Sequence, residues 1–455
     1  MDFTEELLAY VRHPSVSADP AYRQGMVGAR EHACALLKRA GLDVEVVPTP
    51  LHPILVARRR GPREWPHVVL YGHYDVQPPD PLDLWTSPAF EPVVRDGRIW
   101  GRGTADNKGP HLVAIVALAR LLKRRPDLPL RVTFVIEGEE EIGSPSFPEF
   151  LDRHKAELGE AGCVILSDTA SPSSDQIVIT NGLRGIVGLE VTLTGPKGDL
   201  HSGLEGGAVY NPIQALAEIC ASLHKADNTV AVDGFYEGVQ PPAPWEREQL
   251  AQLGLTDPAY AARLGVDALH PAPGLTGAEA TRFAPTLEFN GIGGGYQGEG
   301  SKTVIPSKAF AKITCRLVPG MDPARVTERV ESAIRARVPR GIRCDIHRRQ
   351  GSAAYFVCPP GRPNTPPRQR PLLAKAFAEA DAAIAAAFGR APLYLREGGS
   401  VPIIEDIRRE TGLDSVMIGL FTPDSRLHAP DENLELRMAE RALATYERLL
   451  ERLAS

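Results

Sequence analysis

Short apolar runs alternate with helical spacings over residues 4–166 of the chain. Apolar residues recur at helical spacing in 4–11 and 28–40, and the stretch 110–123 is apolar nearly all round, which is typical of a buried helix. The runs typical of strands are 42–47, 54–57, 68–71, 130–136 and 163–166. Strands that alternate with helices predict an α/β fold with a mostly parallel sheet covered by helices.

The pattern changes near residue 185. Residues 186–194 alternate between apolar and polar, which indicates a strand with one exposed face. Helical and strand-like stretches then follow in the order strand, helix, strand, strand, helix, strand, namely 186–194, 211–224, 286–292, 308–318, 323–338 and 342–347. This order predicts an α+β open-faced sandwich, in which two helices cover one side of a four-stranded antiparallel sheet.

The last part of the chain returns to the first pattern. Prolines and glycines dominate 358–371, which favours a hinge. A helix is expected at 371–388, a buried strand at 415–420 and an amphipathic helix at 435–453. We therefore predict a catalytic domain in two parts, 1–184 and 358–455, with the sandwich inserted between them at 185–357.

Composition narrows the function classes. The chain has 455 residues, a formal net charge of -6 and 43% hydrophobic residues, which is typical of a globular protein and argues against a nucleic-acid partner. No apolar run is long enough to span a bilayer, and the first ten residues do not resemble a secretory signal. The six cysteines are widely spaced and form no C-x-x-C pair, which favours free thiols and a cytoplasmic setting.

Metal-ligand residues follow the apolar strands. His73 and Asp75 come directly after 68–71, and the triplet 139–141, three consecutive glutamates, follows 132–136. Asp106 lies between them in a glycine-rich turn. Imidazole and carboxylates are the ligands that zinc or manganese takes in hydrolases, and the carboxyl ends of strands are where open α/β sheets place their chemistry.

Each of these features has an ordinary structural explanation when taken alone. The glutamate triplet could be a solvated acidic turn, and the glycine-rich turn could simply precede a helix. Two further candidates, Asp168 and His428, also come after apolar runs. Ligand residues at so many strand ends make a metal site the better interpretation, because a cation would offset the repulsion between crowded carboxylates.

In their order and spacing, these motifs resemble the two-metal metallopeptidase family of aminoacylases, acetylornithine deacetylases, succinyl-diaminopimelate desuccinylases and carnosinases. The resemblance extends from His73 to His428. Within the family the chain is most similar to the carnosinase-like dipeptidases, through 303–306 (Thr-Val-Ile-Pro), 316–319 (Arg-Leu-Val-Pro) and 396–402 (Arg-Glu-Gly-Gly-Ser-Val-Pro). It departs from many of them in having no histidine within 355–371.

The resemblance implies a zinc-peptidase-like catalytic domain with an inserted lid and dimerisation domain, and it assigns the metal ligands. Asp106 would bridge two divalent ions, zinc in the first place, with manganese or cobalt as alternatives. His73 and Asp168 would complete one site, and Glu141 and His428 the other. The peptide bond between Asp106 and Asn107 is expected to be cis.

The resemblance also assigns the catalytic residues. Glu140, rather than Glu139, would be the general base that acts with a metal-activated water. Asp75 would support His73. His201, in a glycine-flanked loop of the inserted domain, would stabilise the oxyanion in the active site of a partner subunit.

Substrate binding and assembly follow from the same resemblance. The terminal carboxylate of the substrate would be held by Arg316 of the inserted domain together with Ser400 and the backbone of Gly399. Thr303 would also bind the substrate. An arginine fork suits this task. The expected assembly is a homodimer through the inserted domain, acting on small peptides, with no membrane partner.

Three hypotheses for the function remain open at this point. The first is a dipeptidase that cleaves short peptides with Glu140 as base. The second is an N-acyl-amino-acid deacylase of the acetylornithine deacetylase or desuccinylase type, which uses the same chemistry. The third is a metal-binding scaffold without catalysis, which the presence of Glu140 disfavours because a binding protein needs no base. Rates on dipeptides and on N-acetyl amino acids would distinguish them.

Overall fold

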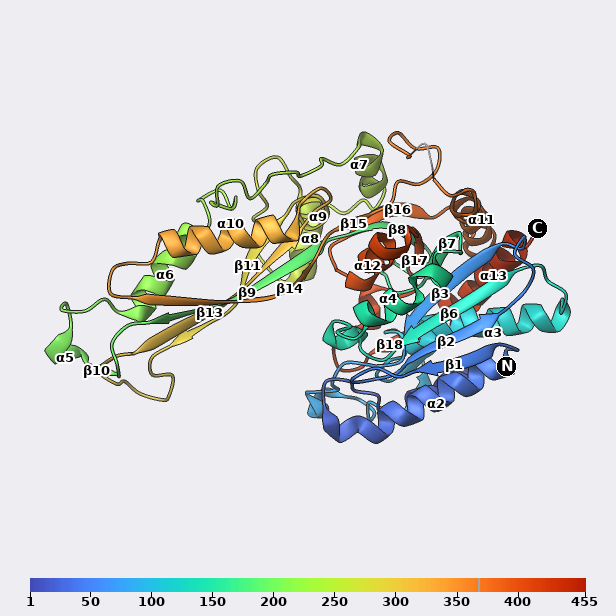
Figure 1. Ribbon diagram of the computed structural model, residues 1–455, viewed down its shortest axis with the longest axis horizontal. Helices are drawn as coiled ribbons and strands as arrows, with labels where there is room; N and C mark the ends of the chain where they lie inside the picture. The colour runs from blue at the N-terminus through green and yellow to red at the C-terminus, as the bar shows by residue number, and fades with distance from the viewer. Residues whose placement is uncertain (367–368) are drawn as a thin grey trace. The chain divides into compact units, whose positions relative to one another are not determined.

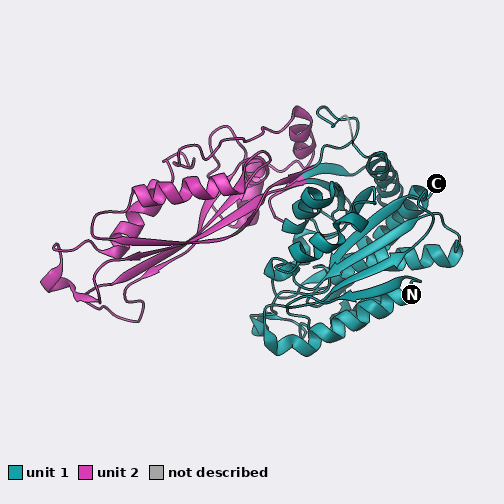
Figure 2. Ribbon diagram, in the orientation of Figure 1, with its two compact units in different colours: residues 1–181, 357–395, 402–455 teal, residues 182–356, 396–401 magenta. Residues whose placement is uncertain are grey.

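The computed structural model describes residues 1–366 and 369–455. The chain forms two compact units, which Figure 2 colours separately. Unit 1 comprises 1–181, 357–395 and 402–455, and unit 2 comprises 182–356 and 396–401. The segment 396–401, which we assigned to the second part of the catalytic domain, therefore belongs to unit 2.

A large mixed sheet, most of whose strands belong to unit 1, has the order β1-β2-β6-β3-β7-β17-β8-β15, and β16 also pairs with β8 (Figure 1). The four central strands β6, β3, β7 and β17 are parallel, whereas β1, β2 and β8 run antiparallel to their neighbours. The strands are β1 (Asp43–Val47), β2 (Ile54–Arg59), β3 (His67–His73), β6 (Arg131–Glu137), β7 (Cys163–Leu166), β8 (Val178–Leu183), β15 (Tyr355–Phe356), β16 (Leu393–Glu397) and β17 (Ser415–Ile418). The predicted α/β class is confirmed, with a parallel centre and antiparallel edges.

Helices pack around this sheet. The helix α3 is buried over most of its circumference, as its composition predicts, and it contacts β3, α1 and α13. The helices are α1 (Phe3–Val11), α2 (Arg23–Arg39), α3 (Lys108–Arg124), α4 (Phe147–Leu158), α11 (Pro371–Phe388), α12 (Pro402–Thr411) and α13 (Leu436–Leu453). Short 3-10 turns are η1 (Pro20–Tyr22), η2 (Leu82–Leu84), η3 (Glu140–Ile142) and η4 (Pro423–Ser425). Within the described residues, no helix is long and apolar enough to cross a bilayer.

A small three-stranded sheet joins distant parts of unit 1. Its order is β18-β5-β4, and its strands are β4 (Val93–Arg95), β5 (Arg98–Trp100) and β18 (Asn433–Glu435). Asn433 pairs with Trp100 in antiparallel register. The pairing places the segment after His428 beside the turn that carries Asp106.

Unit 2 contains the predicted sandwich. Its antiparallel sheet has the order β11-β13-β9-β14, and its core is formed by apolar side chains of the sheet, α6 and α10. The elements are β9 (Gly185–Thr194), α6 (Pro212–Ser222), β11 (Thr286–Gly294), β13 (Lys308–Leu317), α10 (Pro323–Ala336) and β14 (Arg343–Ser352). Buried and exposed positions alternate along β13 over Lys308–Thr314, because one face of the sheet packs on the helices.

Further elements lie between these strands. The Pro-rich segment after residue 239 carries three short helices that the sequence pattern did not predict. These are α7 (Pro244–Ala251), α8 (Asp257–Leu264) and α9 (Gly277–Phe283), while α5 (Ser202–Glu205), β10 (Leu200–His201) and β12 (Val304–Ile305) lie in the loops.

Candidate metal centre

His73 ends the central strand β3, and its side chain is fully buried. Its Nε2 lies 3.1 Å from Asp106 Oδ1 and 3.7 Å from Asp168 Oδ2. Its Nδ1 lies 3.0 Å from the backbone oxygen of Asp75. The ring therefore directs Nε2 toward two carboxylates while its other nitrogen is held by the backbone, which is the usual arrangement of a metal-binding histidine.

Asp106 lies between two histidines that come from opposite ends of the chain. Its Oδ2 is 3.0 Å from Nε2 of His428, which in turn is 3.5 Å from Glu141 Oε2. The Asp106–Asn107 peptide is cis, so this prediction is confirmed. One carboxylate thus contacts an imidazole through each of its oxygens, and this geometry suits a bridging ligand.

The candidate ligands form overlapping groups. Among the described residues, three sets of donors could each hold a metal ion, with their ligand atoms within 4.8 Å of one another. The sets are His73 with Asp106 and Asp168, Asp106 with Glu141 and His428, and His73 with Glu140 and Glu141. The first two match the two sites that the sequence motifs predict, and they share Asp106.

The electrostatics of the cluster fit divalent cations. Burial lowers the pKa of His73, but the carboxylates of Asp106, Asp168 and Asp75 outweigh this and raise it well above the usual value. Glu141 Oε1 is buried and has no hydrogen-bond partner in the part of the chain that the structure describes, while Gln77 Nε2 donates to Oε2 at 2.8 Å. A buried, unpaired carboxylate oxygen is costly, and a cation would satisfy it.

Asp75 and Asn107 form hydrogen bonds with residues of the cluster. The buried Asp75 carboxylate accepts hydrogen bonds from Ser17 Oγ at 2.7 Å and from the backbone N–H of Glu141 at 3.1 Å and of Glu140 at 3.3 Å. It therefore holds the glutamate turn, while His73 is contacted mainly by the Asp75 backbone oxygen. Asn107, which sequence reasoning did not single out, donates from Nδ2 to Asp168 Oδ1 at 2.8 Å.

The carboxyl groups of Glu139 and Glu140 have different surroundings. Glu139 is buried, and its carboxylate accepts hydrogen bonds from the backbone N–H of His52 at 2.8 Å and of Ser146 at 2.9 Å. Glu140 has a half-buried side chain whose carboxyl has no hydrogen-bond partner among the described residues. Burial raises the pKa of Glu140 well above its usual range, Asp168 adds to the rise and His73 opposes it.

The remaining candidates lie in unit 2 and form two groups. Arg316 Nη1 donates to Ser400 Oγ at 2.9 Å, and the backbone oxygen of Gly399 accepts from the N–H of Arg184 at 3.0 Å. Thr303 accepts a backbone hydrogen bond from Ser202 at 3.1 Å, beside the exposed His201. The predicted carboxylate-binding residues Arg316, Ser400 and Gly399 are thus neighbours, whereas Thr303 belongs with His201.

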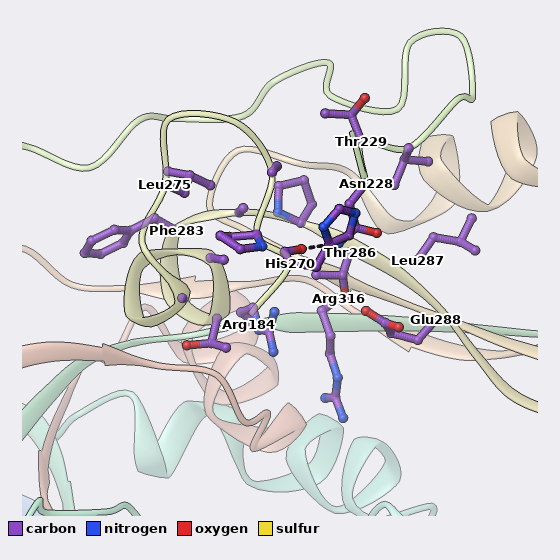
Figure 3. Close-up of a pocket in the computed structure, with 18 of the residues that line it drawn as sticks. Arg184, Asn228, Thr229, His270, Leu275, Phe283, Thr286, Leu287, Glu288 and Arg316 are labelled. Atoms are coloured by element: carbon purple, nitrogen blue, oxygen red, sulfur yellow. Dashed lines mark hydrogen bonds between the residues drawn. The ribbon is translucent and has the colours of Figure 1, made fainter. Parts of the chain in front are cut away.

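Arg316 and Arg184 also line a cavity of about 580 Å³ within unit 2, whose walls include Leu275 and Phe283 (Figure 3). In Figure 3 the guanidinium of Arg316 points away from the side chains of His270 and Leu275. No described carboxylate forms an ion pair with either arginine, and burial lowers the pKa of both, that of Arg184 to about 10. These two partly buried guanidiniums, which share their cavity with the carboxylate of Glu288, are suited to an anionic ligand.

The chain is similar in sequence to known metallopeptidases. The family model of peptidase family M20/M25/M40 matches residues 69–452. Cys-Gly metallodipeptidase dug1 of Schizosaccharomyces pombe is 28% identical over 459 residues, which cover 96% of this chain and 92% of that protein. Beta-Ala-His dipeptidase of Homo sapiens is 28% identical over 453 residues, which cover 95% and 86%.

A solved structure is similar over the full length of both chains. The M20 family metallo-carboxypeptidase Sso-CP2 from Sulfolobus solfataricus has a TM-score of 0.87 and 26% sequence identity, and the match covers 100% of each chain. The family match and the structural match therefore both include the residues of the cluster around Asp106.

Proposed function

Because the chain belongs to peptidase family M20/M25/M40, we propose that it is a metal-dependent dipeptidase that hydrolyses the peptide bond of dipeptides and other short peptides. The observation that carries this proposal is the position of Asp106, whose two oxygens contact His73 at 3.1 Å and His428 at 3.0 Å. The dipeptidase names of the relatives support the choice of substrate class.

Two divalent ions, zinc in the first instance, would be held by the five ligand candidates. His73, Asp106 and Asp168 would hold one ion, and Asp106, Glu141 and His428 the other. When bound, such ions polarise the scissile carbonyl and lower the pKa of water. Manganese or cobalt would also suit these nitrogen and oxygen donors.

Glu140 would act as the general base. Its carboxylate would accept the proton of the attacking water and deliver that proton to the leaving amine. The absence of a hydrogen-bond partner for this carboxyl among the described residues supports the role, because both oxygens remain available. Glu139 is unsuited to it, since backbone N–H groups already occupy its two oxygens.

Unit 2 would bind the substrate. The guanidinium of Arg316, with Ser400 and the backbone of Gly399, would hold the terminal carboxylate of the peptide, and Thr303 would assist. His201 would stabilise the tetrahedral oxyanion in the site of a partner subunit, as part of a homodimer formed through the inserted domain. None of the six cysteines forms a disulfide within the described residues, which supports a cytoplasmic setting.

A panel assay tests the proposal. The metal-free protein would be loaded with zinc, manganese or cobalt and assayed on dipeptides, a tripeptide series and N-acetyl amino acids. We expect dipeptides to be hydrolysed with the highest kcat/KM. Faster hydrolysis of N-acetyl amino acids would favour the deacylase alternative, and release of C-terminal residues from longer peptides would favour a carboxypeptidase. Metal binding without any hydrolysis would favour a scaffold.

A further inference from the structure

The carboxylate of Glu432 is fully buried and accepts hydrogen bonds from the turn that carries Asp106. Its Oε1 accepts from the backbone N–H of Ala105 at 2.9 Å and of Asp106 at 3.0 Å. The N–H of Gly103 lies 3.1 Å from both oxygens. Three backbone N–H groups of one turn therefore donate to a single carboxylate. The sequence motifs did not identify Glu432 as a candidate site residue.

The turn is shaped as an anion-binding concavity. Gly103 has φ +92, in the left-handed region, and a Cβ there would come 2.7 Å from Val76 Cγ1. Successive backbone N–H groups in such a turn point inward and bind an anion. In this chain the anion is its own Glu432, which arrives from the other end of the sequence.

Arg102, in the same turn, neutralises this buried charge. Its Nη1 donates to Glu432 Oε2 at 2.7 Å, and both side chains are at most 1% exposed. Arg102 also stacks over the ring of Trp85 and donates from Nη2 to the backbone oxygen of Pro78 at 3.2 Å. Arg102 thus neutralises the charge of Glu432 without a metal. The hydrogen bonds from Arg102 and from the backbone N–H groups hold the Glu432 carboxylate in the turn.

The segment that carries Glu432 also carries the ligand candidate His428 in a strained conformation. Arg426, His428 and Asp431 have φ values of 55, 59 and 60, which non-glycine residues rarely adopt. Strain of this kind persists only where surrounding contacts enforce it. Here Asp431 accepts from the N–H of Thr86 at 2.8 Å, and the backbone oxygen of Glu432 accepts from the N–H of Gly101 at 2.9 Å.

We infer that Glu432 is a positioning residue for the metal centre, which holds the backbone of Asp106 so that its carboxylate lies between His73 and His428. The N–H that Glu432 binds and the carboxylate that faces the histidines belong to the same residue. Because Glu432 is also four positions from His428, one side chain fixes the spacing between two ligands of the same site. The inference rests on the proposed metal assignment.

The test compares two buried arginine–glutamate pairs. In Glu432→Gln, an NH₂ group replaces one of the acceptor oxygens and faces the converging N–H donors. The control is Glu246→Gln in unit 2, where Glu246 Oε1 and Oε2 accept from Arg396 at 2.7 and 2.9 Å and neither residue contacts a candidate ligand. Zinc affinity would be measured for the metal-free proteins with a competing chelator.

We expect Glu432→Gln to lose about 10–100-fold in zinc affinity, as substitutions of residues that orient metal ligands do, and Glu246→Gln to bind zinc as the wild type does. Equal zinc affinity of the two variants would overturn the positioning role. A wild type that binds no zinc would instead overturn the metal assignment, so the two failures are distinguishable.

A second measurement needs neither metal nor activity. Hydrogen exchange of the peptide spanning 101–107 in the metal-free protein should accelerate in Glu432→Gln and stay unchanged in Glu246→Gln. If Glu432→Gln does not fold, Glu432→Asp replaces it, since the shorter side chain keeps the charge and cannot reach all three N–H groups. Unchanged exchange and unchanged zinc affinity in a folded variant would contradict the inference.

Discussion

The chain holds His73, Asp75 and Asp106 of unit 1 more firmly than His201 and Thr303 of unit 2, whereas the ligand candidate His428 of unit 1 is exposed. His73 and Asp75 are fully buried and Asp106 is 8% exposed, and hydrogen bonds fix each of them. His201 and Thr303 are exposed, with His201 in the short strand β10 and Thr303 directly before the short strand β12. Rigid placement suits metal ligands, whose geometry must be maintained, and exposed loops suit groups that engage a substrate.

This contrast predicts different consequences of substitution. In unit 1 a change in one residue should disturb metal binding or the chemical step. In unit 2 a change should affect substrate binding or the oxyanion while the metals stay in place.

Glu140→Gln should retain both metals and lose about 10²–10⁴-fold or more in turnover, because it removes the proposed base and leaves the ligands intact. Metal content by elemental analysis and kcat on the preferred dipeptide would be measured together. The matched control is Glu139→Gln, which should reduce stability more than turnover because Glu139 holds backbone N–H groups. A fall in metal content of Glu140→Gln would mean that Glu140 is a ligand.

His201→Ala should lose about 10²–10³-fold in kcat with unchanged metal content, since one oxyanion donor is removed. Mixing this inactive variant with inactive Glu140→Gln subunits tests whether sites are shared. If His201 acts in the partner's site, each hybrid dimer regains one working site and activity returns. Subunit exchange without recovered activity would place His201 within its own chain or outside the mechanism.

Arg316→Met should reduce kcat/KM by about 10–100-fold, mainly through KM, because a hydrogen-bonded charge pair with the substrate carboxylate is lost. A dipeptide with a C-terminal amide provides the control. The wild type should disfavour the amide, whereas Arg316→Met should hydrolyse acid and amide at similar rates. A variant that still prefers the acid would remove Arg316 from carboxylate recognition.

Much of the architecture follows from local sequence patterns. His73, the glutamate triplet and Asp168 could be found because they follow apolar strands, while their assignment to sites with Asp106 and His428 came from the family resemblance. The order of elements in the sandwich followed from periodicity alone. The antiparallel edges of the large sheet could not be found in this way, because strand direction depends on connections and neighbours. The helices α7, α8 and α9 were missed since their short, proline-bearing segments carry weak periodicity.

The residues that hold the site were harder to predict than the ligands. Glu432 and Asn107 act through contacts with backbone and side chains that lie far away in the sequence, and neither has a local signature of its role. The segment 396–401 joins unit 2 for a similar reason, since the buried pair between Arg396 and Glu246 forms only in the folded chain. Such partners require three-dimensional information.

The smallest expected effect concerns His67, a buried residue of unit 1 at the start of β3. Its Nε2 is 2.9 Å from Thr133 Oγ1, and its Nδ1 is buried without a hydrogen-bond partner in residues 1–366 and 369–455. Burial, aided by the charge of Arg131, lowers the pKa of His67 from its usual value of 6.5 to about 4. Below pH 6.5 the unfolded chain therefore binds a proton at His67 that the folded chain does not bind. The free energy of unfolding decreases as the pH is lowered, until the folded chain also binds the proton near pH 4.

In the metal-free protein, acidification from pH 7 to 5 should cost the wild type about 1–2 kcal/mol through His67. His67→Gln should be spared this loss, although it is less stable at pH 7. Urea unfolding at both pH values would measure the difference, with His347→Gln on the exposed face of unit 2 as the control. Because the residues of the metal centre are the same in the wild type and in His67→Gln, their titration cancels in the comparison. An unchanged pH dependence in His67→Gln would therefore mean that the buried side of unit 1 tolerates a charge there.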